Sequence, residues 1–155
     1  MDNRWKSSKH AVYNCAYHII WCPKYRRCVL VDGIDDRLKE LLIEKETEHG
    51  WIIENIEVMP DHVHIFIKAT SNDAPVFIVS QLKAYTSFKL RKEYQKLKSR
   101  LPTLWTRAYF VETIGHISEK TIKKYIDDKK INKPYIPRIK ARGFTAFFVN
   151  LIRML

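Results

Sequence analysis

A nine-residue stretch near the middle of the chain constrains the fold most, because its side chains alternate in character. It reads Met59-Pro60-Asp61-His62-Val63-His64-Ile65-Phe66-Ile67. From Val63 to Ile67 every second residue is a β-branched apolar one, and a period of two is typical of a half-buried strand. The segment Met59-Pro60-Asp61 predicts a turn, so we expect residues 51–58 to pair with the histidine strand as an antiparallel hairpin.

The two histidines of this strand, His62 and His64, are expected to project from the same face of the sheet. Side chains two apart on a strand point the same way. Neutral imidazole binds divalent transition metals, and two in register leave room for an oxygen ligand and a substrate oxygen. A His-x-His triplet is a short pattern, however. On the residues alone, the pair is either a metal site or two histidines on a solvated sheet face.

Further strands and helices are predicted on both sides of this hairpin. Residues 12–21 are rich in aromatic and β-branched types and indicate a first strand. Asp35 or Asp36 can cap a helix that carries Leu38, Leu41 and Leu42 on one stripe and ends at Gly50. Residues 107–113 indicate a fourth strand.

Two helices complete the expected pattern. A long one spans about residues 75–98, with Asp73 as its cap and with Ile78, Leu82 and Tyr85 on its inner face. A last one spans about residues 119–130 behind Ser118. Helices alternating irregularly with antiparallel strands predict an α+β fold with a mostly antiparallel sheet. The apolar end of the chain, within residues 131–155, is expected to be a docking helix or a dimer contact.

The charge of the chain favours a polyanionic partner. The sequence has 155 residues, the size of one domain, and a formal net charge of +11. Basic residues concentrate in residues 83–107 and 120–142, with aromatic residues between them, and such surfaces suit single-stranded nucleic acid. The alternative is two ordinary solvated helix faces. The candidate nucleic-acid contacts are Lys24, Arg26, Arg27, Lys83, Lys89 and Arg91.

Cysteine usage and hydropathy give the expected compartment. The three cysteines, Cys15, Cys22 and Cys28, form no Cys-x-x-Cys pair, so neither a disulfide framework nor a four-cysteine zinc site is indicated. No apolar stretch reaches the roughly 20 residues that span a bilayer, and no signal segment is recognisable. We expect a cytoplasmic protein that makes no membrane contact.

Tyr125 falls within the last predicted helix, beside the buried stripe of Ile122 and Ile126. Lys129 follows one turn later. A phenol is a poor nucleophile at neutral pH, but a metal that polarises a phosphate, or a nearby cation, lowers the barrier to its attack. Tyr125 is therefore either a half-buried tyrosine packed on the sheet or the nucleophile of a strand-transfer reaction.

Four segments together resemble one known family. They are Tyr17-His18-Ile19-Ile20-Trp21-Cys22-Pro23-Lys24-Tyr25-Arg26-Arg27, Met59-Pro60-Asp61-His62-Val63-His64, Leu104-Trp105-Thr106-Arg107-Ala108-Tyr109-Phe110-Val111 and Thr113-Ile114-Gly115. In this order and spacing, the chain resembles the single-tyrosine HUH transposases of the small insertion sequences, the two-hundred group. The resemblance covers about residues 10–130, so we expect a transposase domain at 1–130 and a C-terminal extension at 131–155.

The resemblance implies a fold, an activity and partners. The fold would be a ferredoxin-like or RRM-like HUH core, and the protein would be a homodimer that recognises DNA hairpins near the ends of the element. His62 and His64 would bind Mg²⁺ or Mn²⁺. Tyr125 would attack the scissile phosphate of single-stranded DNA and form a 5′-phosphotyrosine.

This sequence departs from the family at one position. Members commonly carry Gln as a third metal ligand four residues after the tyrosine, where this chain has Lys129, a cation without a lone pair while protonated. Asp128 is the nearest oxygen donor on that helical face, with Asp127 and Asp61 as less favoured substitutes.

Other functions stay open on the sequence alone. A related HUH nickase of the replication-initiator or mobilisation type, or a domesticated transposase, would share the chemistry. A non-catalytic RRM-like nucleic-acid-binding module would use the histidines and Tyr125 only structurally. A phosphodiesterase with paired His-x-His-like motifs is disfavoured because the sequence contains a single such motif.

Overall fold

The computed structural model describes residues 5–115 of the chain. The chain divides into a unit Met1–Thr113 and a unit Ile114–Leu155. Tyr125, Asp127, Asp128, the Ser118-capped helix, the expected domain boundary at residue 130 and the C-terminal extension lie outside the described residues.

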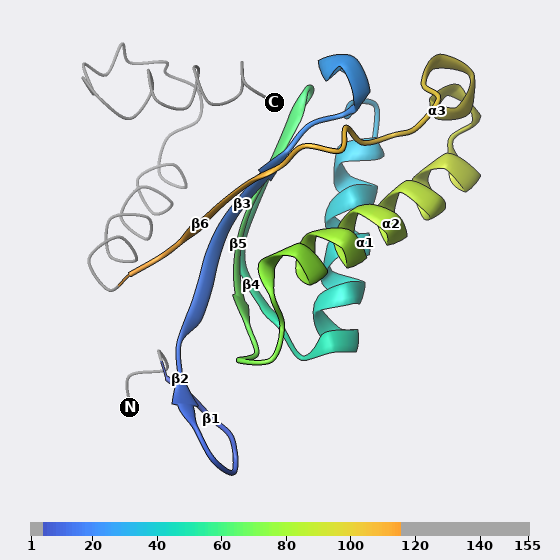
Figure 1. Cartoon of the computed structure of the whole chain (residues 1–155). Helices are drawn as coiled ribbons and strands as arrows, with labels where there is room; N and C mark the ends of the chain where they lie inside the picture. Colours follow the sequence, from blue (N-terminus) through green and yellow to red (C-terminus); the bar gives the residue numbers. More distant parts are fainter. Residues whose placement is uncertain (1–4, 116–155) are drawn as a thin grey trace, which may run out of the picture. The chain divides into compact units, whose positions relative to one another are not determined.

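A four-stranded antiparallel sheet forms the centre of the first unit (Figure 1). Its strands are β3 (Cys15–Trp21), β4 (Ile52–Met59), β5 (His62–Ala69) and β6 (Phe110–Thr113), and they lie side by side in the order β4-β5-β3-β6. Helix α1 (Ile34–His49) links β3 to β4, and α2 (Pro75–Glu93) with α3 (Gln95–Arg100) links β5 to β6. This β-α-β-β-α-β order is that of the ferredoxin-like fold, so the expected α+β class and core are confirmed.

Both long helices pack on one face of the sheet, as Figure 1 shows for α1 and α2. The core joins alternate residues of the central strands to the inner stripes of α1 and α2, and includes Ile19, Trp21, Val63, Ile65, Ile67, Ile34, Leu38, Leu41, Leu42, Ile78 and Leu82. Because strand residues alternate between faces, the side chains of His18, His62 and His64 lie on the face opposite α1 and α2. The expected hairpin of β4 and β5 is confirmed, with Met59 opposite His62 and Val58 opposite Val63.

The first predicted strand is interrupted. Val12–Tyr13 forms the short strand β2, which pairs with β1 (Lys6–Ser7) in a separate two-stranded sheet, and β3 begins only at Cys15. Asn14 belongs to neither strand. The apolar pattern runs through this position, but the partner strand changes there from β1 to β5, which a residue pattern does not reveal.

Two predicted helix starts were wrong in their caps. Helix α1 begins at Ile34 behind Gly33, whose φ of 87° is left-handed, and Asp35 and Asp36 lie in the first turn without a capping hydrogen bond. Asp73 does not cap α2, because its carboxylate accepts hydrogen bonds from the Trp51 indole at 2.7 Å and the Thr70 hydroxyl at 2.7 Å. The predicted end of α1 at Gly50 is confirmed, with the φ of 68° that glycine tolerates best.

The long helix expected over residues 75–98 is two helices. Tyr94 has an extended backbone between α2 and α3, with φ −116° and ψ 95°. The change in direction brings Leu97 and Leu101 into the same core as Leu90. The last strand is also shorter than predicted and starts at Phe110, because residues 106–108 bind a lysine of α2 instead of extending the sheet. Within residues 5–115, no helix combines the length and the apolar character that a bilayer crossing needs.

Candidate active site and nucleic-acid interface

His62 and His64 lie beside each other on β5, as the alternation of the sequence predicted. Their ring centroids are 4.8 Å apart, and both side chains are only partly exposed. His62 lies at the start of β5, next to the turn at Pro60, and His64 lies opposite Ile20 of β3. The strand register alone therefore brings two imidazoles to one place on the sheet.

A carboxylate and a guanidinium fix the orientation of His62. Nδ1 of His62 lies 2.6 Å from Oδ1 of Asp61, and the other carboxylate oxygen accepts a hydrogen bond from Nη2 of Arg26 at 2.8 Å. Burial alone would raise the pKa of Asp61, but the bonds from His62 and Arg26 outweigh it and hold that pKa below its usual range. An ionised carboxylate only accepts, so Nδ1 of His62 carries the proton and the lone pair of Nε2 is available to a metal.

His64 has a comparable neighbour in His18 of β3. Nε2 of His18 lies 3.3 Å from Nδ1 of His64, and the two rings stack with centroids 5.5 Å apart. Burial lowers the pKa of His18, which favours the neutral ring that can share one proton with His64. His18 falls within the segment Tyr17–Arg27, but no role was predicted for it. Its position in the alternation of β3 could have shown which face it lies on. That this face adjoins His64 follows only from the pairing of β3 with β5.

The donor chemistry of this face fits a divalent metal only in part. Two imidazoles with their second nitrogens engaged are suitable ligands. Within residues 5–115, however, no three or more His, Cys, Asp or Glu side chains are grouped so that they could hold a metal ion. Asp61 contacts the rear nitrogen of His62 and so orients that ligand. Asp128, the further ligand expected from the sequence, lies outside the described residues.

The basic loop after β3 docks against the segment that begins with Leu104-Trp105-Thr106. The loop is the 3₁₀ turn η1 (Lys24–Arg26), in which Tyr25 and Arg26 have left-handed φ of 59° and 50°. The backbone of Lys24 donates to the carbonyl of Leu104 at 2.8 Å, and that of Thr106 donates to the carbonyl of Cys22 at 3.1 Å. The two motifs thus form one structural unit that presents Arg26 to Asp61.

Lys83 is tied to the same unit from α2. Its ammonium donates to the carbonyls of Thr106, Arg107 and Ala108 at 2.6, 3.2 and 3.3 Å. Burial lowers its pKa to about 8. Lys83 was predicted to contact nucleic acid, and that role stays a prediction, but in this structure its ammonium binds the backbone of the protein.

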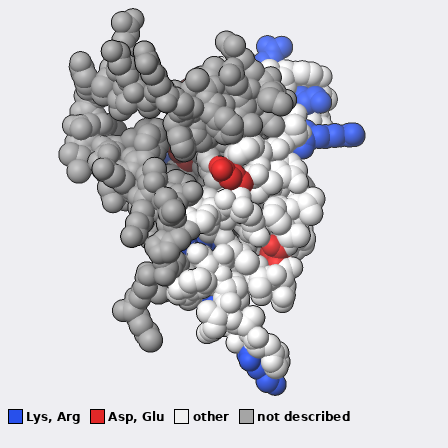
Figure 2. Space-filling model, turned by 60° about the vertical axis from the view of Figure 1, so that its left-hand side comes forward, with Lys and Arg blue, Asp and Glu red and all other residues white. Residues whose placement is uncertain are grey.

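Most of the other predicted nucleic-acid contacts also interact with groups of the protein itself. Arg26 pairs with Asp61, and Arg91 donates to the carbonyls of Leu101 and Pro102 at 3.2 and 3.0 Å. Lys24 and Lys89 lie over the rings of Tyr25 and Tyr85, and Arg27 is exposed. Figure 2 shows lysine and arginine side chains at the upper end of the described part, where η1 and α3 lie in Figure 1, and again at the tip of the β1–β2 hairpin.

Comparison with known proteins agrees with the fold and the motifs. The family described as "Transposase IS200 like" matches residues 11–129. The ISDra2 transposase TnpA of Deinococcus radiodurans is 36% identical over 126 residues, which cover 80% of this chain and 90% of that protein. The transposase of insertion sequence IS200 from Salmonella typhimurium is 30% identical over 135 residues, 83% of this chain and 88% of the relative.

Solved structures show the same relationship. A crystal structure of a Deinococcus radiodurans transposase is 34% identical and superposes with a TM-score of 0.66, covering 79% of this chain and 96% of that one. A tyrosine transposase bound to a REP hairpin is 14% identical with a TM-score of 0.55, covers 82% of this chain and 74% of that one, and shares the fold. The histidine strand, the docked motifs and these matches agree, and the chain belongs to the IS200-like transposase family.

Proposed function

We propose that this transposase cuts and rejoins single-stranded DNA at insertion-sequence ends, with Tyr125 as the nucleophile and with His62 and His64 as ligands of Mg²⁺ or Mn²⁺. The observation that carries the proposal is the histidine pair on β5, whose orientation is set by Asp61 and His18. Structural histidines on a solvated face would need neither partner. Family membership supplies the reaction class, which is DNA cleavage and transfer.

The reaction requires no nucleotide cofactor. The phenolic oxygen of Tyr125 bonds to the scissile phosphorus, the bond from phosphorus to the 3′-oxygen breaks, and that oxygen leaves as a 3′-hydroxyl after it takes up a proton. A 3′-hydroxyl of another end then attacks the 5′-phosphotyrosine, and the phenol regains its proton. A bound divalent ion would polarise the phosphate and neutralise the charge that develops on its oxygens.

The residues of this chain prepare that phosphate site. Asp61 holds the proton on Nδ1 of His62, so that Nε2 faces outward as a ligand. His18 orients the ring of His64 through the contact between Nε2 of His18 and Nδ1 of His64. Arg26 neutralises Asp61 and keeps its carboxylate in place. Asp128 is proposed as the third ligand, because Lys129 has replaced the usual amide.

The partner is proposed to be single-stranded DNA that folds into hairpins, and the working form a homodimer in the cytoplasm. A hairpin is bound by the tyrosine transposase of similar fold, and the net charge of +11 favours a polyanion. A dimer would let the tyrosine of one subunit act at the histidine pair of the other.

Replacing Tyr125 by Phe tests the nucleophile. We expect Tyr125→Phe to abolish the covalent protein–DNA adduct formed on hairpin-bearing single strands in Mn²⁺, as read on a denaturing gel, because the substitution removes only the phenolic oxygen. Tyr13→Phe is the matched control, since Tyr13 lies on the separate hairpin of β1 and β2, and it should form the adduct as the unaltered chain does. An adduct that persists in Tyr125→Phe contradicts the assignment.

Mixing variants tests whether the site is shared. Tyr125→Phe combined with His62→Ala protein should recover part of the cleavage, because a heterodimer would hold one site with an intact tyrosine and an intact histidine pair. If subunit exchange is shown and no cleavage returns, the site is built within one subunit.

A further inference from the structure

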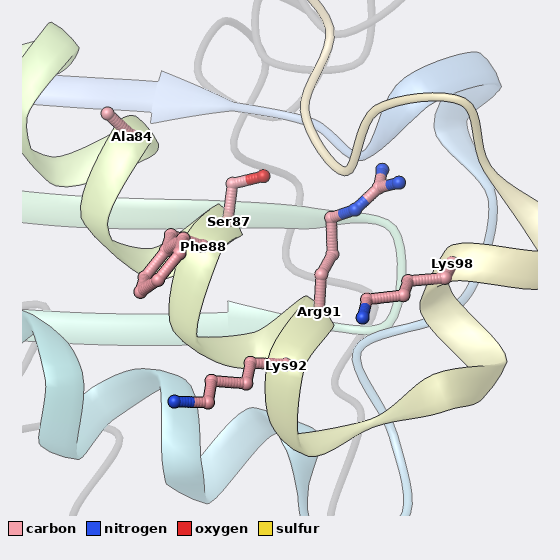
Figure 3. A pocket seen from close by; sticks show the side chains of 6 residues that line it. All are labelled: Ala84, Ser87, Phe88, Arg91, Lys92 and Lys98. Carbon is pink, nitrogen blue, oxygen red and sulfur yellow. The ribbon is translucent and has the colours of Figure 1, made fainter.

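A shallow cavity lies on the outer side of α2 and α3, the side away from the sheet. Its volume is about 430 Å³, and its lining consists of Ala84, Ser87, Phe88, Arg91, Lys92 and Lys98. Figure 3 shows the first five on successive turns of α2, with Lys98 reaching from α3 toward Arg91. We call it the α2–α3 cavity. None of its residues belongs to the histidine face.

Phe88 is the unusual member of this lining, because its side chain is 67% exposed. It sits between Thr86 and Leu90, which are both buried, and so points away from the buried side of α2. A single exposed apolar residue needs no explanation by itself. An exposed aromatic ring among cations is the combination found where single-stranded nucleic acid binds.

The charges around the ring are all positive. Arg91, Lys92 and Lys98 line the cavity, and no acidic side chain does. Glu93 is the one acidic residue between Pro75 and Arg100, and it is bound in a bidentate ion pair to Arg37 of α1, with distances of 2.9 and 3.1 Å. The cavity therefore presents a field suited to phosphate groups.

The positions of the cations are also partly fixed. Arg91 is held by the two carbonyls at the end of α3, which use one terminal nitrogen and leave other guanidinium N–H groups to donate. Lys92 and Lys98 come from two different helices, so they can contact successive phosphates on either side of a bound nucleotide. The hydroxyl of Ser87 adds a small polar group beside the ring.

We propose that the α2–α3 cavity binds an unpaired nucleotide of the DNA, with its base stacked on Phe88 and its flanking phosphates on Lys92 and Lys98. This rests on the proposed function and deepens it, because it names where unpaired bases of the DNA would lie apart from the cleavage chemistry. Paired bases are stacked inside a duplex and cannot reach the ring. A protein partner is the poorer occupant, since the lining offers one aromatic ring amid three cations.

The test is equilibrium binding of the full-length chain to two fluorescent probes, an oligothymidine of about 20 nucleotides and a blunt duplex of the same length. EDTA is present throughout, so that cleavage cannot influence the readout. Phe88→Leu keeps apolar bulk without a ring, and Phe88→Trp keeps a ring. Val76→Ala is the control, because Val76 is exposed on the same helix but does not line this cavity.

We expect Phe88→Leu to weaken binding of oligothymidine by about 5- to 150-fold, the range for loss of one stacked base. Phe88→Trp and Val76→Ala should bind within about 2-fold of the unaltered chain, and duplex binding should change by less than about 2-fold in all variants. Lys92→Gln and Lys98→Gln should each flatten the salt dependence on oligothymidine by about 0.7 log units per log unit of salt.

Unchanged oligothymidine binding by Phe88→Leu would overturn the proposal, and so would an equal loss on the duplex. A loss confined to self-association, measured by sedimentation, would instead make the cavity a protein contact. Tyr125→Phe separates this proposal from the proposed function. If that variant binds oligothymidine normally and the unaltered chain never forms an adduct, the result supports the base-binding site and contradicts the phosphotyrosine mechanism.

Discussion

The histidine face of the sheet, which carries His18, His62 and His64, and the α2–α3 cavity differ in how their side chains are held. On the histidine face, each functional ring has a hydrogen-bonding partner, and the series from Arg26 through Asp61 to His62 is continuous. In the cavity, by contrast, Phe88 is exposed, and the structure shows no hydrogen bond or ion pair from the side chains of Lys92 and Lys98 within residues 5–115.

This difference in how the side chains are held indicates that the two regions have different roles. A metal ligand must be fixed closely in place, because a displacement of about 1 Å can cost about 100-fold in rate. A surface that follows a flexible strand gains more from long cations and an open ring that adapt to it. We therefore infer that substitutions on the histidine face change chemistry, and that substitutions in the cavity change affinity.

The largest expected effect comes from removing a histidine of the pair. His62→Ala or His64→Ala should lower metal-dependent cleavage by about 100- to 1000-fold, since polarisation of a phosphate by a metal contributes several kcal/mol. Binding of hairpin DNA in EDTA should stay within about 3-fold. Phe88→Leu should show the reverse pattern, with weak binding and near-normal cleavage at saturating DNA. Full-rate cleavage in Mg²⁺ by either histidine variant would contradict the assignment of His62 and His64 as metal ligands.

A smaller effect is expected from the group behind His62. Asp61→Asn should weaken Mn²⁺ binding, measured by calorimetry on the DNA-free protein, by about 10- to 100-fold, which is typical when the orienting partner of a ligand is changed. Asp32→Asn is the matched control, because Asp32 is an exposed acid paired with Lys96 away from the histidines. Equal Mn²⁺ affinity of the Asp61→Asn and unaltered proteins would show that Asp61 does not prepare the ligand.

The smallest expected effect concerns Lys83, whose ammonium binds the backbone of the protein. Because the pKa of Lys83 is about 8 in the folded chain and its ordinary value is 10.5, the unfolded chain binds more protons between these values. Its contribution to stability is therefore least favourable below pH 8 and improves as the pH rises through this window. After discounting for its partial exposure, the gain is about 1–2 kcal/mol.

Lys83→Met removes this titration and provides the comparison. Denaturant unfolding of both proteins between about pH 7.5 and 10.5 should show the unaltered chain gaining stability relative to the variant. A constant difference across that range would mean that the pKa of Lys83 is the same in the folded and unfolded chains, and would contradict a lowering of that pKa by burial.

Local pattern was sufficient for the central hairpin and its two histidines. The alternation of Val63, Ile65 and Ile67 specified which face packs against α1 and α2, and a period of two then placed His62 and His64 together on the other face. Gly50 marked the end of α1 for an equally local reason, since only its own φ decides the matter. The four motifs also identified the family, because each is a continuous run of residues.

The structure was needed wherever a side chain chose a distant partner. Asp73 binds Trp51 instead of capping a helix, Lys83 binds the backbone of residues 106–108 instead of facing solvent, and Tyr94 interrupts a helix whose apolar spacing continues. Each choice depends on which strands and loops the fold makes neighbours.

The sequence by itself thus determined the elements, the paired histidines and the basic character of this protein, which are properties of neighbouring residues in the chain. Only the tertiary structure decided that His18 reaches His64, that Arg26 reaches Asp61, and that Phe88 and Lys98 share a cavity. The physical reason is that hydrogen bonds and ring contacts act over a few ångströms in space, and the packing of α1 and α2 on one sheet face sets which residues come within that range.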